Sequence, residues 1–419
     1  MVKKLALTNQ KKLEEIAHDI PTPFHLYDEK GIREKAQALN QAFSWNKGFK
    51  EYFAVKATPN PTILKILQEE NCGLDCASNV ELTMAKRLSF QPGEVMFSSN
   101  VTPLEDYQKA RDLGAYINLD AFEHIDFLKN ANFDFPKTIC LRYNPGGEFH
   151  LGTDIMSQPE ESKFGMTKEQ ILAGIIRLKD FGVKEFGIHA FWASNTEGNN
   201  YYPELARQLF SFLLEIKQET GVTLSFVNLS GGIGVNYKPT DEIADIYEIG
   251  KKVERAYHEI LTENSVSNVK IFTELGRFML GPYGNLVTRV RHLKHTYRDY
   301  VGVDASSVDL MRPSIYGAYH HITIAGKENL EETHIYDVTG SLCENNDKFA
   351  VERQLPEIEV GDLLVIHDTG AHGYSMGNQY NGKLRSAEVL LKEDGSYKLI
   401  RRAETEDDYF ATFKGLNWD

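Results

Sequence analysis

The chain has 419 residues, of which 42% are hydrophobic and 25% are charged, the proportions of a globular protein. Its formal net charge of −14 argues against nucleic-acid binding, which needs clustered Lys and Arg, and against binding to anionic membranes. No apolar run approaches the roughly 20 residues of a membrane helix. The four cysteines show no zinc-site spacing, which predicts a reducing, cytoplasmic location and no bound metal.

Strand-like apolar runs alternate with amphipathic helical patterns through the first two-thirds of the chain. Strands are expected at 52–55, 73–76, 95–97, 116–119, 138–143, 186–191, 226–229 and 270–274. Helices are expected at 61–70, 79–88, 103–113, 168–181 and 202–219. Eight alternating pairs over about 250 residues are the layout of a (β/α)8 barrel. No GxGxxG motif follows the first strand to favour a doubly wound open sheet. We therefore predict an α/β fold with a barrel over residues 26–280.

The pattern changes after about residue 281, where strand-like runs are separated by polar turns and few helices. These strands are expected at 286–300, 322–325, 335–338, 363–367 and 387–391. Residues 383–402 read as a hairpin with Glu393, Asp394 and Gly395 at its turn. We predict a C-terminal all-β domain, a sandwich or barrel, formed by residues 281–419 together with residues 1–25.

A lysine in an unusual place, Lys56, is the leading candidate for a catalytic residue. It lies in the apolar segment 51–60, EYFAVKATPN, at the end of the first predicted barrel strand. Burial there would lower the pKa of the amine, because burial disfavours the ammonium, and the neutral amine attacks carbonyl groups. A Schiff base with pyridoxal phosphate needs such an amine. The alternative is an edge-strand lysine whose ammonium reaches solvent, and Lys56 by itself favours that alternative.

Polar residues follow other predicted barrel strands, at the end where barrel active sites form. Asp75 ends the second strand, where an acid adjusts the local field. The segment 230–235, SGGIGV, is a turn whose backbone N–H groups can approach a phosphate, although such turns are common. Glu274 and Arg277 end the last strand. An acid beside a pyridine nitrogen keeps that nitrogen protonated, whereas a local Glu–Arg surface pair is the alternative.

Two segments of the predicted β domain also carry reactive side chains. Arg312 and Tyr316 lie in residues 311–321, where the planar fork of an arginine suits a carboxylate. Cys343 lies beside Glu344 in a polar loop. A lone cysteine is usually packing, but an exposed thiol next to charge can move protons.

The order of these motifs is a lysine, DCAS, a glycine-rich turn, ELGR, RPxxYGAYH, CE and GAxGxSM…YNG. It closely resembles the fold type III (alanine-racemase-fold) amino-acid decarboxylases, and within them the diaminopimelate decarboxylases. The resemblance extends over residues 23–391. It implies pyridoxal 5′-phosphate as cofactor and decarboxylation of meso-2,6-diaminopimelate to L-lysine and CO2, a step of lysine biosynthesis. It also implies an obligate homodimer whose active sites are shared across the interface.

The resemblance implies a role for each matching residue. Lys56 would bond covalently to the cofactor, and Cys343 of the partner subunit would donate a proton. Glu274 would pair with the pyridine nitrogen, which argues against a racemase, since alanine racemases place an arginine there. Residues with predicted cofactor contacts are Lys56, Asp75, His189, Phe191, Gly231, Gly232, Glu274, Gly276, Arg277, His372 and Tyr380. Residues with predicted substrate contacts are Arg277, Arg312, Tyr316, Glu344 and His372.

Three positions depart from the family pattern. Phe191 replaces the histidine that stacks on the cofactor ring, although its own π-face, or His189 two residues before it, can take that place. Ser230 replaces the first glycine of a GGG turn, and His372 replaces a tyrosine. Such changes leave the substrate open to another D- or L-amino acid of the lysine or ornithine type, or to a carrier-bound amino acid.

A non-catalytic regulator with the same fold is a third alternative. It is opposed by the joint presence of Lys56, Glu274 and Cys343.

Overall fold

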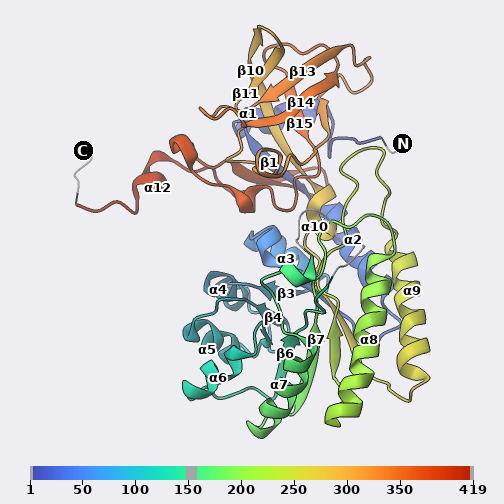
Figure 1. Cartoon of the computed structure of the whole chain (residues 1–419). Helices are drawn as coiled ribbons and strands as arrows, with labels where there is room; N and C mark the ends of the chain where they lie inside the picture. Colours follow the sequence, from blue (N-terminus) through green and yellow to red (C-terminus); the bar gives the residue numbers. More distant parts are fainter. Residues whose placement is uncertain (1–2, 148–157, 416–419) are drawn as a thin grey trace. The chain divides into compact units, whose positions relative to one another are not determined.

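The computed structural model describes residues 3–147 and 158–415 (Figure 1). Its internal contacts divide it into two compact units. The barrel unit contains the described residues of Arg33–Val235 and Glu242–Met279. The β-rich unit contains those of Met1–Ile32, Asn236–Asp241 and Leu280–Asp419. Among the described helices, none combines the length and the apolar character that crossing a membrane requires.

The barrel unit holds eight parallel strands that close into a barrel, which confirms the predicted fold class. The strands are β2 (Lys50–Ala54), β3 (Gly73–Cys76), β4 (Val95–Ser98), β5 (Tyr116–Leu119), β6 (Thr138–Arg142), β7 (Glu185–His189), β8 (Phe226–Asn228) and β9 (Lys270–Thr273). Pairing of Lys50 with Phe272 and of Glu51 with Thr273 joins β9 back to β2 and closes the ring. Each strand overlaps its predicted run, because short apolar segments bounded by turn residues are reliable strand signals.

Helices alternate with the barrel strands along the chain, and α3 to α9 surround the strands (Figure 1). They are α2 (Glu29–Ala42), α3 (Pro61–Glu69), α4 (Asn79–Arg87), α5 (Leu104–Asp112), α6 (Glu123–Asn130), α7 (Lys168–Asp180), α8 (Tyr201–Thr220), α9 (Ile246–Tyr257) and α10 (Arg277–Leu280). Polar caps start several of them: the side chain of Asn60 accepts a hydrogen bond at the start of α3, and Thr167 forms a capping box with Gln170 at α7. The two long helices α8 and α9 lie side by side (Figure 1).

Large side chains fill the interior of the barrel. Tyr52, Met96, Cys140, Phe226 and Phe272 form one buried cluster, in which the rings of Phe226 and Phe272 stack with centroids 4.5 Å apart. Layers of bulky side chains make such a barrel a packed core rather than a channel. Chemistry in this unit is therefore confined to the ends of the strands.

The β-rich unit is built on one nine-stranded sheet. Its strands are β1 (Phe24–Asp28), β10 (Gly284–His295), β11 (Asp299–Val303), β12 (Ile322–Ile324), β13 (His334–Thr339), β14 (Lys348–Leu355), β15 (Leu363–Ile366), β16 (Ala387–Leu391) and β17 (Tyr397–Arg401). The main path runs in the order β14-β13-β11-β10-β1-β16-β17, and β15 pairs with β10 and β12. Its helices are α1 (Gln10–Asp19), α11 (Arg312–Tyr316) and α12 (Glu406–Phe410).

Two sequence expectations for this unit have clear outcomes. The hairpin expected at 383–402 is confirmed by the antiparallel pairing of β16 with β17. The single strand expected at 286–300 is wrong, because the chain reverses between β10 and β11, where Thr296 N–H donates to Arg298 C=O at 3.0 Å. Apolar residues continue on both sides of this short turn, so the sequence pattern did not reveal it.

The predicted domain limits, 26–280 and 281–419 with 1–25, stay a prediction. The contact grouping places the residues up to Ile32, and the separate segment Asn236–Asp241, with the β-rich unit.

Candidate active site

Lys56 lies two residues beyond the end of β2, in the 3-10 turn Val55–Ala57. Val55 and Ala57 are buried, but the side chain of Lys56 is exposed. The expectation that the barrel wall buries this lysine is therefore wrong, because strand pairing stops at Ala54 and the chain then turns out of the wall. The Nζ atom lies 6.0 Å from the centroid of the Phe191 ring. The amine is thus accessible and has an aromatic face beside it.

Glu274 follows β9 directly and is buried. Its Oε2 lies 3.0 Å from His189 Nε2 and accepts a hydrogen bond from Ser230 Oγ at 3.1 Å. Its Oε1 accepts a hydrogen bond from Asn228 Nδ2 at 2.7 Å. His189 ends β7, Asn228 ends β8 and Ser230 begins the following turn. The carboxylate is therefore held by groups from neighbouring strand ends.

Two glycines bring the predicted segments into contact. A Cβ atom added at Gly276 would lie 2.7 Å from the Cβ of Ala57, so the ELGR segment packs directly against the turn that carries Lys56. A Cβ added at Gly231 would lie 2.8 Å from the carbonyl oxygen of Glu274 and 3.7 Å from the Phe191 ring. Only glycine permits the two approaches that are shorter than 3 Å. The structure thus brings together Lys56, Phe191, the Ser230-Gly231-Gly232 turn, and Glu274 with its neighbours Gly276 and Arg277.

The surroundings shift the pKa values of two buried acids of this unit in opposite directions. Burial alone would raise the pKa of Glu274, but the charge and hydrogen bond of His189, then Lys56 and Asn228, hold it below its usual value. Burial, followed by the nearby charge of Glu274, raises the pKa of Asp75 well above its usual value. Of these two acids, Glu274 therefore ionises at the lower pH and Asp75 at the higher.

Arg142 is a charged residue of this region that the sequence analysis missed. It ends β6 and is buried, with its Nη1 3.1 Å from Asp120 Oδ1, just beyond β5, and its guanidinium 4.2 Å from the centroid of the Phe164 ring. Together with Phe191 it lines a small pocket. The sequence did contain a signal for this pair: Arg142 and Asp120 lie at the ends of two predicted strands that are neighbours in the barrel.

Glu51 is a further buried acid, and it lies within β2 itself. The backbone N–H of Leu275 donates to its Oε1 at 2.8 Å, and Thr273 Oγ1 donates to its Oε2. Burial raises the pKa of Glu51 to about 8, despite these two hydrogen bonds. The folded protein therefore binds a proton here that the unfolded chain, with an ordinary glutamate pKa of 4.5, releases at lower pH.

We expect Glu51→Gln to change how stability depends on pH. A folded-state pKa above the unfolded value means that the stabilising contribution of the protonated acid is complete below about pH 4.5 and lost as pH rises through about 8. The free energy of unfolding of the wild type should therefore fall across this window relative to the variant, by a few kcal/mol in order of magnitude. Denaturant titration at several pH values measures it. The exposed Glu105→Gln is the control, and parallel pH profiles for wild type and Glu51→Gln would contradict the expectation.

The remaining predicted site residues lie in the β-rich unit. Arg312 is buried, with its Nη1 2.7 Å from His320 Nε2 and its guanidinium 4.4 Å from the centroid of the Tyr237 ring. Tyr316 is exposed at the end of α11, and His372 is half-buried with a positive φ of 56°. Their contacts with substrate and cofactor stay predictions.

The structure joins two of the predicted motifs of this unit. The backbone N–H of Cys343 donates to Asn381 Oδ1 at 2.7 Å, which ties the loop carrying Cys343 and Glu344 to the turn carrying Tyr380. Cys343, Glu344 and Tyr380 are all exposed. The predicted role of Cys343 in proton transfer stays a prediction.

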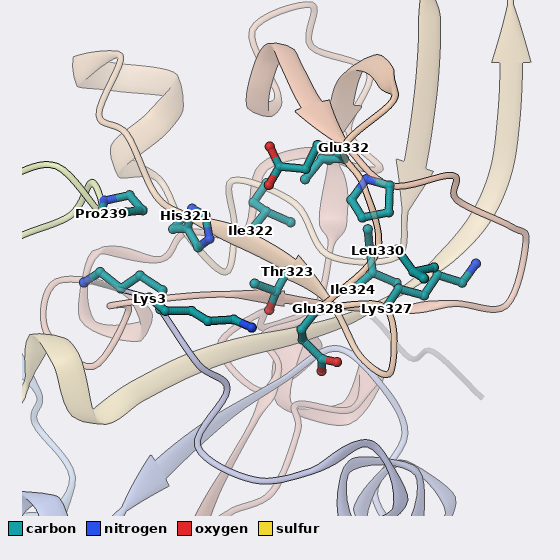
Figure 2. Close-up of a pocket in the computed structure, with 13 residues that line it drawn as sticks. Lys3, Pro239, His321, Ile322, Thr323, Ile324, Lys327, Glu328, Leu330 and Glu332 are labelled. Carbon is teal, nitrogen blue, oxygen red and sulfur yellow. The ribbon is translucent and has the colours of Figure 1, made fainter. Parts of the chain in front are cut away.

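A pocket of about 290 Å³ in the β-rich unit lies along β12 (Figure 2). The predicted site residues, which all fall in the described ranges, are absent from its lining. Its lysines already have partners: Lys4 pairs with Asp368 at 2.8 Å, Lys327 with Asp362 at 2.8 Å, and Lys3 donates to the side chain of an asparagine. It is therefore no ready site for an anion.

The comparison with protein families decides the chemistry of the barrel site. Residues 29–281 match the model described as "Pyridoxal-dependent decarboxylase, pyridoxal binding domain". The chain belongs to the pyridoxal-dependent decarboxylases. It is 39% identical to Protein TabA of Pseudomonas amygdali pv. tabaci, over 95% of this chain and 92% of that protein.

Other members of this decarboxylase family support the narrower resemblance. The chain is 34% identical to a diaminopimelate decarboxylase of Methanothermobacter thermautotrophicus, over 94% of this chain and 92% of that protein. Its fold matches the crystal structure of diaminopimelate decarboxylase from M. jannaschii in co-complex with L-lysine, with a TM-score of 0.87 and 28% identity over 96% and 94% of the two chains. The resemblance to the diaminopimelate decarboxylases is confirmed, and the protein is a pyridoxal phosphate-dependent carboxy-lyase.

The barrel unit of this decarboxylase fits the cofactor. Asp75 Oδ1 and His189 Nδ1 are buried polar atoms without a hydrogen-bond partner, which is expected where a polar group binds. The accessible amine of Lys56 and the ionised Glu274 are the two groups that a pyridine aldehyde needs.

Proposed function

We propose that this decarboxylase converts meso-2,6-diaminopimelate to L-lysine and CO2. The observation that carries the proposal is a barrel site in which Lys56 and Glu274 lie on segments in direct contact. Similarity to proteins named diaminopimelate decarboxylase over nearly the whole of both chains supports the substrate.

Each residue of the barrel unit has a defined task in this proposal. When bound, the cofactor accepts the electrons that remain on the α-carbon after CO2 leaves. Lys56 would hold the cofactor covalently, and the turn of Ser230, Gly231 and Gly232 would offer backbone N–H groups to its phosphate. Glu274, kept ionised, would hold a proton on the pyridine nitrogen.

Residues of the β-rich unit would handle the substrate. The guanidinium of Arg312 and the hydroxyl of Tyr316 would bind its carboxylate. Cys343, supported by Glu344, would return a proton to the α-carbon. We propose that Cys343 acts on the active site of a second subunit, so that the enzyme works as a homodimer.

Decarboxylation of another D- or L-amino acid, or of a carrier-bound amino acid, is the second candidate. Two observations favour it: the identity to Protein TabA exceeds that to the diaminopimelate decarboxylase, and Phe191 stands beside Lys56 where the resemblance predicts a histidine. A phenyl ring keeps a stacking face but loses the polar edge that an imidazole offers.

The test is release of CO2 by the holoenzyme from meso-diaminopimelate, compared with L-lysine, L-ornithine and L-glutamate at equal concentrations. We expect kcat/KM for meso-diaminopimelate to exceed the others by about 10³-fold, since a site built for a second end with both an amine and a carboxylate rejects substrates that carry only one of them there. The Lys56→Ala protein gives the background. A higher kcat/KM for any of the other three amino acids would overturn the substrate, and no release from any of them would favour a different amino acid.

A further inference from the structure

The carboxylate of Glu274 receives three side-chain hydrogen bonds, from His189, Asn228 and Ser230. We call these three residues the Glu274 cradle. All of them are buried, and they come from the ends of β7 and β8 and from the turn after β8. Three donors satisfy most of the acceptor capacity of a carboxylate that little water can reach.

Ser230 is the member of the cradle that the family pattern does not contain, because the resemblance predicts glycine there. Its backbone has a positive φ of 54°, a conformation that glycine adopts freely and that strains a residue with a Cβ. Two bonds hold this backbone in place: its N–H donates to Asn228 Oδ1 at 2.7 Å, and its carbonyl accepts from the hydroxyl of Tyr202. A serine in this conformation needs a compensating interaction, and the bond of its hydroxyl to Glu274 supplies one.

The surroundings of Glu274 explain why a third donor matters. Burial disfavours its ionised form and has the largest influence on its pKa. Phe191, beside Gly231, brings an apolar ring to a position where the resemblance predicts an imidazole. Hydrogen bonds to the charged form of Glu274 oppose both effects.

We propose that Ser230 is a positioning residue that, together with Asn228, keeps Glu274 ionised and fixed in orientation in this enzyme. The consequence for catalysis rests on the proposed role of Glu274 at the pyridine nitrogen. The hydrogen bond itself is a property of the protein without cofactor. An experiment can therefore reject the hydrogen bond of Ser230 to Glu274 without rejecting the role of Glu274 in catalysis, and the reverse also holds.

The first experiment uses the apoprotein. Infrared difference spectra of the wild type against Glu274→Gln isolate the carboxylate band of Glu274, and a pH series gives its pKa. We expect Ser230→Gly to raise this pKa by about one unit, a tenfold change in proton affinity. Ser230→Ala should raise it equally. Glycine relieves the backbone strain at position 230 and alanine does not. An equal rise of the Glu274 pKa in both variants would therefore result from loss of the hydroxyl.

Ser98→Ala is the matched control, because Ser98 ends β4 and its hydroxyl accepts from Asn118 Nδ2 at 3.1 Å. We expect no shift of the Glu274 pKa in this variant. An unchanged Glu274 pKa in Ser230→Gly, or an equal shift in Ser98→Ala, overturns the proposal.

The second experiment uses the holoenzyme. We expect Ser230→Gly to lower kcat about tenfold with KM nearly unchanged, and to shift the pH midpoint of the absorbance of the bound cofactor. If the apoprotein pKa moves while kcat and the absorbance midpoint stay at their wild-type values, and Glu274→Gln is equally active, the cradle is supported and the role of Glu274 is rejected.

Discussion

Lys56→Ala should yield a colourless protein with no detectable decarboxylation. The variant lacks the only group in the candidate site that can bond covalently to the aldehyde of the cofactor, among the residues that the structure describes there. We expect kcat/KM to fall by at least about 10³-fold, the scale of losing a residue that forms a covalent bond in catalysis. Stability should change little, because the side chain is exposed and follows β2 rather than packing in the barrel.

Two variants separate chemistry from charge at this position. Lys56→Arg keeps a cation on a long side chain but has no amine able to form the bond, so it should be as inactive as Lys56→Ala. Lys65→Ala removes an exposed lysine of α3 and should keep wild-type absorbance and activity. Visible absorbance after dialysis against cofactor-free buffer, and CO2 release, measure both. A yellow, active Lys56→Ala enzyme would contradict the role of Lys56.

The barrel was predictable because its strands are short apolar runs that end in turns. The runs at 73–76 and 116–119 match β3 and β5 residue for residue. The β-rich unit was harder, because its strands pair with partners far away in the sequence. Strand β1 lies between β10 and β16, and its five residues contain no local pattern that indicates either neighbour.

The candidate site shows the same division between local and distant information. Lys56, Asp75 and Glu274 were found because each lies at the end of a recognisable strand or just after it. The bond between His189 and Glu274 joins residues that are 85 positions apart, so no local pattern contains it. Ser230 looked like a small change in a glycine turn, and only the fold shows its hydroxyl against Glu274. The exposure of Lys56 depends on where β2 stops pairing, which propensity does not determine to within two residues.

The homodimer proposal makes a second strong prediction, for mixtures of two inactive proteins. If Cys343 serves the active site of the partner subunit, a mixed dimer of Lys56→Ala and Cys343→Ala subunits contains one site with both mutations and one with neither. Random exchange of equal amounts makes half of the dimers mixed. About a quarter of the wild-type activity should therefore return, from proteins that are each at least about 10²-fold less active alone.

The exposure of Cys343, whose loop is held by the hydrogen bond of its N–H to Asn381, is consistent with a thiol that reaches another chain. The double variant Lys56→Ala/Cys343→Ala is the matched control: mixed with wild type it should lower activity, because each mixed dimer then has two defective sites. Activity after subunit exchange, with exchange verified by mass labelling, measures both mixtures. No recovery in the first mixture despite verified exchange would place Cys343 in the active site of its own chain, or outside the chemistry altogether. Recovery of about a quarter of the wild-type activity would support an active site shared between subunits. Two defective chains restore activity only when each contributes the residue that the other lacks.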